Sequence, residues 1–129
     1  MSYRKIQAAL DARLLTSNET QIAFPGRPYR PAHGAAYVAV EFRPAPVEAI
    51  FLGPGAPELH RGLYRLTLHD PDAVAAESRV DALRSHFNRG RILTFESLDV
   101  HLEGASMAAA EGDLRRTAVR LDISWRSYF

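Results

Sequence analysis

The stretch FLGPGAPELHRGLYRLTL, residues 51–68, leads from a glycine- and proline-rich segment directly into an alternating pattern. Apolar side chains fall at every second position of its end: Tyr64, Leu66 and Leu68. This period of two is typical of a strand with one buried face. The glycines do not form a phosphate-binding loop, because such a loop opens a helix and is followed by lysine and serine or threonine. The stretch therefore predicts a loop that enters a sheet.

Upstream of this strand, residues 37–42 alternate in the same way, with Val38, Val40 and Phe42 on one face. The segment between the two strands, residues 44–60 and here called the arm, is too long for a tight hairpin. Apolar side chains on such a loop are costly to leave in water. We therefore expect the arm to meet a partner surface, and the alternative is that it folds back onto its own sheet. The apolar residues concerned are Val47, Ile50, Phe51 and Leu52.

A first helix is predicted near the start of the chain. Ser2 can cap it, and apolar residues recur with helical spacing at Tyr3, Ile6, Leu10 and Leu14. The helix should end near Thr16–Asn18, and residues 21–24 could then form a short strand. Residues 25–35 hold too many prolines and glycines for a regular element and predict a loop.

A second helix is predicted after the strand at residues 63–68. Asp70 is the expected N-cap and Pro71 the expected first-turn residue. Asn88 and Gly90 are expected to end the helix. Its buried stripe should comprise Ala76, Val80, Leu83 and Phe87.

The rest of the chain predicts three further strands, at residues 92–96, from Leu98 to Leu102, and over the alternating final segment. The small-residue stretch GASMAAAEGD, residues 104–113, is predicted to be a loop. In the final strand, Val119, Leu121, Ile123 and Trp125 should face the core. This order of elements predicts one α+β domain over residues 1–129, in which two helices pack on one face of a mostly antiparallel sheet.

Composition narrows the function classes. The chain has 129 residues, 47% hydrophobic and 24% charged, which is typical of a globular domain with a single core. It contains no cysteine, so disulfides and thiolate metal sites are excluded. No apolar run approaches the roughly 20 residues that a membrane-spanning helix needs, and no secretory signal is visible.

Catalytic motifs are missing. The sequence has no Gly-x-Ser-x-Gly elbow and no His-Glu-x-x-His pair, and the spacing of its five histidines predicts no metal site. Only His69 is followed by an acid, and Asp70 is already expected to cap a helix. We therefore predict no catalytic, cofactor or metal residues.

Charge is nearly balanced, with 16 basic and 15 acidic side chains, so the chain lacks the strong field of a nucleic-acid binder. Small basic clusters remain, and none is interleaved with the aromatic residues that single-strand binders use. These arginines could face DNA passively, without reading bases. The candidate residues are Arg27, Arg30, Arg89, Arg91, Arg115 and Arg116.

Four motifs taken in order, SYRKIQAAL, HRGLYRLTLHDP, HFNRGR and VRLDISW, resemble the tail terminator proteins of long-tailed bacteriophages and related prophages, of the lambda minor tail protein U type. The resemblance covers most of the chain. The sequence departs from the family pattern after Pro71, where Asp72 and Ala73 lead directly into the helix and the glycine-rich link expected there is missing.

This resemblance implies a structural protein rather than an enzyme. It implies a homo-oligomeric ring, a hexamer, that caps the head-proximal end of the tail tube, stops its growth and offers a surface to the head–neck connector or stopper. DNA would pass through the lumen, and the chain would act in the host cytoplasm and then in the virion. Interface residues are assigned by position: Val47, Ile50, Phe51, Leu52 and Arg61, with the six arginines named above at the rim or lumen. Another neck or tail-tube subunit of similar fold, or a small binding domain, remains the alternative.

Overall fold

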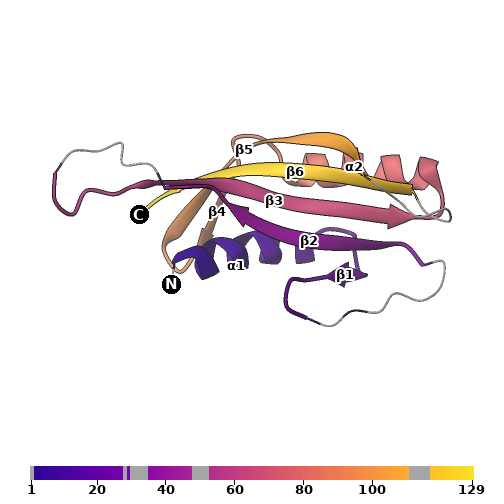
Figure 1. Cartoon of the computed structure of the whole chain (residues 1–129), viewed down its shortest axis with the longest axis horizontal. Coiled ribbons are helices and arrows are strands. Elements are labelled where there is room, and N and C mark those ends of the chain that lie inside the picture. Colours follow the sequence, from indigo (N-terminus) through magenta and orange to yellow (C-terminus); the bar gives the residue numbers. More distant parts are fainter. Residues whose placement is uncertain (1, 28, 30–34, 48–52, 111–116) are drawn as a thin grey trace.

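The computed structural model describes residues 2–27, 29, 35–47, 53–110 and 117–129, and within them it contains two α-helices and one six-stranded sheet. The strands lie in the order β1-β2-β3-β6-β5-β4 (Figure 1). Neighbouring strands are antiparallel except β1 and β2, which are parallel. The α+β class and the mostly antiparallel sheet are confirmed.

Helix α1 spans Ser2–Leu15 and buries the predicted stripe, because Ile6, Leu10 and Leu14 are fully buried. The helix ends where the Thr16 hydroxyl donates to the Arg13 carbonyl at 2.7 Å and the Ser17 hydroxyl donates to the Leu14 carbonyl. These bonds satisfy carbonyls that have no partner within the last turn of a helix.

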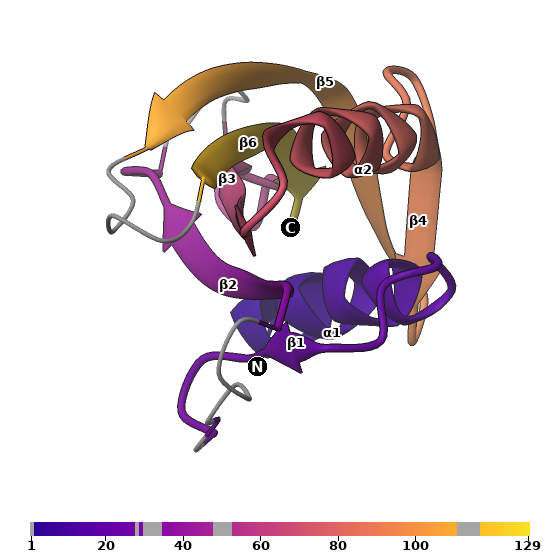
Figure 2. The same ribbon diagram turned by 90° about the vertical axis from the view of Figure 1, so that its right-hand side faces the viewer.

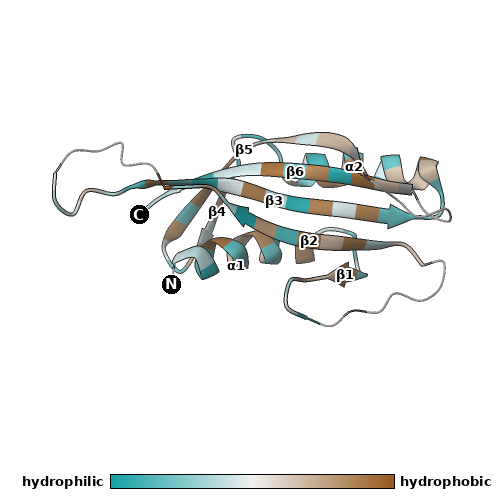
Figure 3. Ribbon diagram, in the orientation of Figure 1, coloured by the Kyte–Doolittle hydropathy of each residue, from teal (hydrophilic) through white to brown (hydrophobic). Residues whose placement is uncertain are grey.

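The central strands are longer than their sequence patterns indicate. After the short β1 (Ile22–Ala23), β2 spans Tyr37–Pro44, β3 spans Leu59–Asp70 and β6 spans Thr117–Tyr128. Val40 pairs with Leu66, and Leu66 pairs with Leu121, so the three predicted apolar faces lie side by side. Figure 3 shows hydrophobic and hydrophilic residues alternating along these strands.

Helix α2 spans Ala73–His86, and its predicted start was wrong. The N-cap is Asp72, whose carboxylate accepts from the Val74 N–H at 3.0 Å, whereas Asp70 is the last residue of β3 and Pro71 precedes the helix. Asp70 cannot cap the helix because it is still paired with Thr117 in the sheet. The buried stripe is confirmed: Ala76, Val80, Leu83 and Phe87 are buried.

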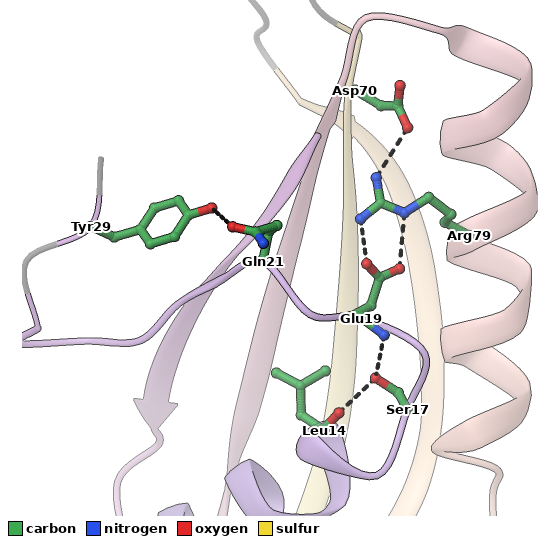
Figure 4. A network of polar contacts seen from close by, with 7 residues as sticks. All are labelled: Leu14, Ser17, Glu19, Gln21, Tyr29, Asp70 and Arg79. Atoms are coloured by element: carbon green, nitrogen blue, oxygen red, sulfur yellow. Dashed lines mark hydrogen bonds and ion pairs between the residues drawn. The ribbon is translucent and has the colours of Figure 1, made fainter. Parts of the chain in front are cut away.

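Asp70 instead takes part in a partly buried ionic network (Figure 4). Arg79 of α2 donates from Nη1 to Asp70 at 3.0 Å and from Nε to Glu19 at 2.9 Å. The hydrogen bond to Glu19 is the main cause that raises the pKa of Arg79, and burial opposes it. Ser17 positions Glu19 by accepting its main-chain N–H at 3.2 Å. The network ties the segment after α1 to the start of α2 and the end of β3.

Strands β4 (Ile92–Phe95) and β5 (Leu98–Ala110) form a hairpin around Glu96 and Ser97, both of which have positive φ angles. The prediction of a loop over residues 104–113 was wrong for its first seven residues, which continue β5. Pairing with β6 explains this result. Residues 104–110 lie opposite β6, with Met107 facing Leu121, so this segment is held as a strand even though most of its residues are small. A bulge lies between Leu102 and Gly104.

Both helices pack on the same face of the sheet, as predicted, and the sheet curls around them (Figure 2). The contacts of α1 are mainly with β4 and β5, and those of α2 are with β6 and β3. Val119 is only partly buried against this core. The core residues predicted from the sequence and found buried together are Leu10, Leu14, Val80, Leu83, Phe87, Leu121 and Ile123.

Candidate assembly interface

The arm leaves the sheet at one end of the molecule. Its strand-free part is residues 45–58, shorter than the predicted 44–60, because Pro44 ends β2 and Leu59 and His60 begin β3. Figure 1 shows its described parts, 45–47 and 53–58, extending past the ends of these strands, at the end where the two chain termini lie. Val47 is 42% exposed. The other apolar candidates, Ile50, Phe51 and Leu52, lie outside the described residues.

The root of the arm is fixed by main-chain pairing and close packing. Ala45 donates its N–H to the Arg61 carbonyl at 2.8 Å, and Glu58 exchanges two main-chain hydrogen bonds with Phe129. A Cβ atom at Gly62 would lie 2.6 Å from both the Arg43 carbonyl oxygen and the Trp125 ring. Position 62 therefore accepts only glycine, because β2 and the Trp125 ring pack directly against the β3 backbone there.

An aromatic cluster surrounds this root. The ring of His60 stacks on Phe129 with centroids 3.5 Å apart, and its Nδ1 lies 3.0 Å from the Tyr3 hydroxyl. Phe42 stacks on Trp125 with centroids 5.5 Å apart. The sequence analysis missed His60. Its position four residues before the buried Tyr64 places both side chains on the core face of β3. The cluster packs the arm root against α1 and the C-terminal Phe129.

Arg61, one of the predicted interface residues, shares a single carboxylate with Arg126, which the sequence analysis did not single out. Arg61 Nε lies 3.9 Å from Glu103, and Arg126 Nη1 lies 3.6 Å from the other oxygen of the same group. Arg89 borders the same depression as Glu103 and Arg126. Two arginines thus share one acid on the outer side of β3, β6 and β5.

The other predicted charges are dispersed. Arg27 follows β1 and lies over the Phe24 ring, 5.6 Å from its centroid. Arg91 donates to the Asn88 side chain at 2.7 Å in the turn after α2, which is a local structural contact. Arg30, Arg115 and Arg116 lie outside the described residues.

The chain matches the model of a known protein family. A model described as phage tail terminator protein matches residues 5–125. The chain belongs to the phage tail terminator family. No curated protein matches this terminator chain.

Two solved structures share the fold of the terminator chain. One, whose name says nothing of its role, has a TM-score of 0.77 at 19% identity and covers 100% of this chain and 97% of its own. The other belongs to the virion of a native gene transfer agent particle, with a TM-score of 0.60, 16% identity and coverages of 96% and 93%. At such identities these likenesses concern the fold alone.

The outer face of the terminator's central strands carries a charged ladder. Arg65 Nε donates to Asp122 at 2.8 Å, and Glu41 lies 3.8 Å from the same guanidinium. The hydrogen bond that Arg65 donates to Asp122 is the main cause that raises the pKa of Arg65. Because these charges neutralise one another, the ladder joins neighbouring strands without leaving a strong net field.

Neither a candidate metal site nor a membrane-spanning helix is present in the part of the terminator that the structure describes. There, no group of three or more His, Asp or Glu residues could hold a metal ion, and no helix is long and apolar enough to cross a membrane. His69 stacks on Tyr37 with centroids 4.6 Å apart, which is a structural contact between β3 and β2.

Proposed function

We propose that this phage tail structural protein forms a hexameric ring that caps the head-proximal end of the tail tube, stops tube polymerisation and presents a joining surface to the head–neck connector or stopper. The arm is the observation that carries the proposal. It combines a root held by main-chain pairing and ring stacking, an exposed Val47 and three more apolar residues in the sequence, and its described parts extend past the ends of β2 and β3.

A ring requires a contact in which one surface of each copy meets a different surface of the next. A specific interface removes more than about 1,000 Å² from water, with a few apolar or arginine anchors dominating its energy. We assign the anchor role to Val47, Ile50, Phe51 and Leu52, with Arg61 at the rim.

The role is non-catalytic and needs no cofactor. DNA crosses the ring only passively, and the basic residues at the rim or lumen are Arg27, Arg30, Arg89, Arg91, Arg115 and Arg116. Assembly takes place in the host cytoplasm, after which the protein remains in the virion at the tail–neck junction.

The test introduces Phe51→Asp and Leu52→Asp together in the phage that encodes the chain. Buried charges at both anchors should abolish ring formation and capping, while the circular dichroism spectrum stays that of the folded chain. Lysates should then contain overlong tails and free heads in electron micrographs.

A matched control changes two exposed apolar residues of the body, Leu15→Asp with Val74→Asp, which are 64% and 76% exposed. This variant should give tails of normal length joined to heads. Normal tails from the arm variant as well would show that the arm is not the assembly element.

The same micrographs separate the alternative roles, because the products of a failed step differ. Loss of a neck subunit leaves finished tails of normal length beside free heads, and loss of a tube subunit leaves no tails. Only overlong tails support the terminator role.

A further inference from the structure

The arm leaves the sheet through two stems, Ala45 directly after β2 and Glu58 directly before β3. Ala45 donates its N–H to the Arg61 carbonyl at 2.8 Å. Glu58 exchanges main-chain hydrogen bonds of 3.0 and 3.2 Å with Phe129, the residue that follows β6. Both stems therefore continue the main-chain pairing of the sheet beyond the ends of its strands.

Tyr3, in the first turn of α1, lies between the two stems. On the side of β2 its ring meets the ring of Phe42 edge to face, with centroids 6.5 Å apart. On the side of β3 it meets the rings of His60 and Phe129 edge to face, with centroids at 5.4 and 5.9 Å. Such ring pairs attract one another beyond the area that they bury. One side chain of α1 therefore joins both strands that carry the arm.

His60 is a demanding residue to bury at this position. It is 7% exposed and shares the core face of β3 with Tyr64 and Leu66. A buried polar ring costs free energy unless its nitrogens find partners. The Phe129 carbonyl, 3.2 Å away, can only accept, so in the neutral ring Nε2 carries the proton and Nδ1 accepts from the Tyr3 hydroxyl at 3.0 Å. An apolar side chain would pack here without these requirements, so packing alone does not account for the histidine.

We propose that Tyr3, His60 and Phe129 form a clasp that positions the arm for assembly. Their two directional hydrogen bonds and their ring contacts fix the direction in which both stems leave the sheet. The inference rests on the proposed function, in which the arm is the assembly element, and it adds the residues that direct the arm. A stem that is already ordered in the free subunit loses less conformational entropy when the arm docks.

The place of the clasp in the fold suits positioning more than core stability. Tyr3 and Phe129 are only partly buried and pack against the margin of the core, whereas Leu10, Leu66 and Leu121 fill its interior. Figure 1 shows the C-terminus beside the point where the arm leaves the sheet. Loosening the clasp should therefore release the stems while the core stays folded.

The test replaces Phe129 with alanine, which removes the ring stacked on His60. The Glu58 amide is the local probe, because its partner is the Phe129 carbonyl. Under conditions in which every chain is monomeric, hydrogen exchange of this amide should become at least about tenfold faster, while the Leu66 amide at the centre of β3 keeps its slow exchange. Tyr3→Phe removes only the hydroxyl, should change the exchange in the same direction, and replaces Phe129→Ala if that variant does not fold.

Ile22→Ala is the matched control. Ile22 is also a partly buried apolar residue that packs against the core. It pairs with Val38, which lies about 20 Å along β2 from Pro44 at the arm end. This variant should lose some stability and keep the wild-type exchange of the Glu58 amide, because it leaves the clasp intact.

Sedimentation velocity then measures the consequence for assembly. The wild type and Ile22→Ala should form rings at the same concentration, whereas Phe129→Ala should need at least about tenfold more protein. Circular dichroism checks that each variant is folded. The arm variant Phe51→Asp, Leu52→Asp should form no rings and yet show wild-type exchange at Glu58, since it changes the arm and not the clasp.

Unchanged exchange at Glu58 in both Phe129→Ala and Tyr3→Phe would overturn the clasp. Faster exchange with undiminished ring formation would overturn its part in assembly. Failure of the proposed function is seen in a different variant: the arm variant would then form rings and give tails of normal length. In that case the clasp has no assembly element to position, and the inference falls with the proposed function.

Discussion

Burial of Asp11 beside Tyr64 is expected to make the stability of the subunit depend on pH. The buried Tyr64 hydroxyl donates to the Asp11 carboxylate at 2.5 Å. Burial raises the pKa of Asp11 above its ordinary value, and the bond from Tyr64 together with the charge of Arg27 only partly offsets this. Burial also raises the pKa of Tyr64, so the phenol stays protonated and remains the donor.

Because the pKa of Asp11 is higher in the folded chain, the folded state favours the protonated acid. The contribution of this residue to stability is therefore complete below the ordinary aspartate pKa of about 3.9 and is lost as the pH rises through the raised value. Asp11→Asn keeps an acceptor for Tyr64 and does not titrate. We predict that its free energy of unfolding, measured with urea, gains on the wild type between pH 3.5 and 7.

Tyr64→Phe is the control for this prediction. It removes the bond that lowers the pKa of Asp11, so the loss of stability with rising pH should be steeper than in the wild type. Parallel pH profiles for the wild type and Asp11→Asn would show that the carboxyl group does not titrate differently on folding.

Among the elements, α2 shows how much a periodic pattern can predict. Its stripe places Leu83 in the core at 2% exposure, whereas Asp99 of β5 is exposed and its side chain accepts a hydrogen bond from the Thr94 hydroxyl. Leu83→Ala should cost about 2 to 5 kcal/mol through lost transfer energy and a cavity, and Asp99→Ala less than about 1 kcal/mol. Urea midpoints measure both, and equal small effects would contradict the helix-on-sheet packing.

Elements with strong periodicity were predictable because one buried face imposes the pattern. The second half of β5 was not, since Gly104 and the alanines after it carry no alternation and have low strand propensity. Its strand state comes from the register with β6, which is a tertiary effect. The prediction of the N-cap of α2 was wrong for a similar reason. Both Asp70 and Asp72 suit an N-cap by sequence, and it is the pairing of Asp70 with Thr117 in the sheet that excludes Asp70.

The candidate site likewise has one part that the sequence predicts and another that depends on tertiary structure. Apolar residues on a long loop predicted the arm, but the packing of its root against Tyr3 and Phe129 joins residues far apart in the sequence, and no local pattern indicates that. Likewise, Arg61 and Arg126 lie far apart in the sequence and meet around Glu103 because β3, β6 and β5 are neighbours in the sheet.

For the whole molecule, assembly should appear as stability that depends on concentration, because a ring binds the folded subunit and not the unfolded chain. If six subunits dissociate and unfold together, a hundredfold increase in concentration adds about 2.3 kcal/mol per subunit. A chain of 129 residues has an unfolding entropy near 0.27 kcal/mol per kelvin, so the melting temperature should rise by about 8 °C.

Calorimetric scans of the wild type at about 2 and 200 µM would measure this rise. The arm variant Phe51→Asp, Leu52→Asp should melt at one temperature at both concentrations, close to that of the dilute wild type, because it retains the core and loses only the ring. The body variant Leu15→Asp, Val74→Asp should keep the full rise. A wild-type melting temperature that does not change with concentration would mean that folding is not linked to self-association, and the arm would then have to bind the tail tube or the neck instead of its own kind.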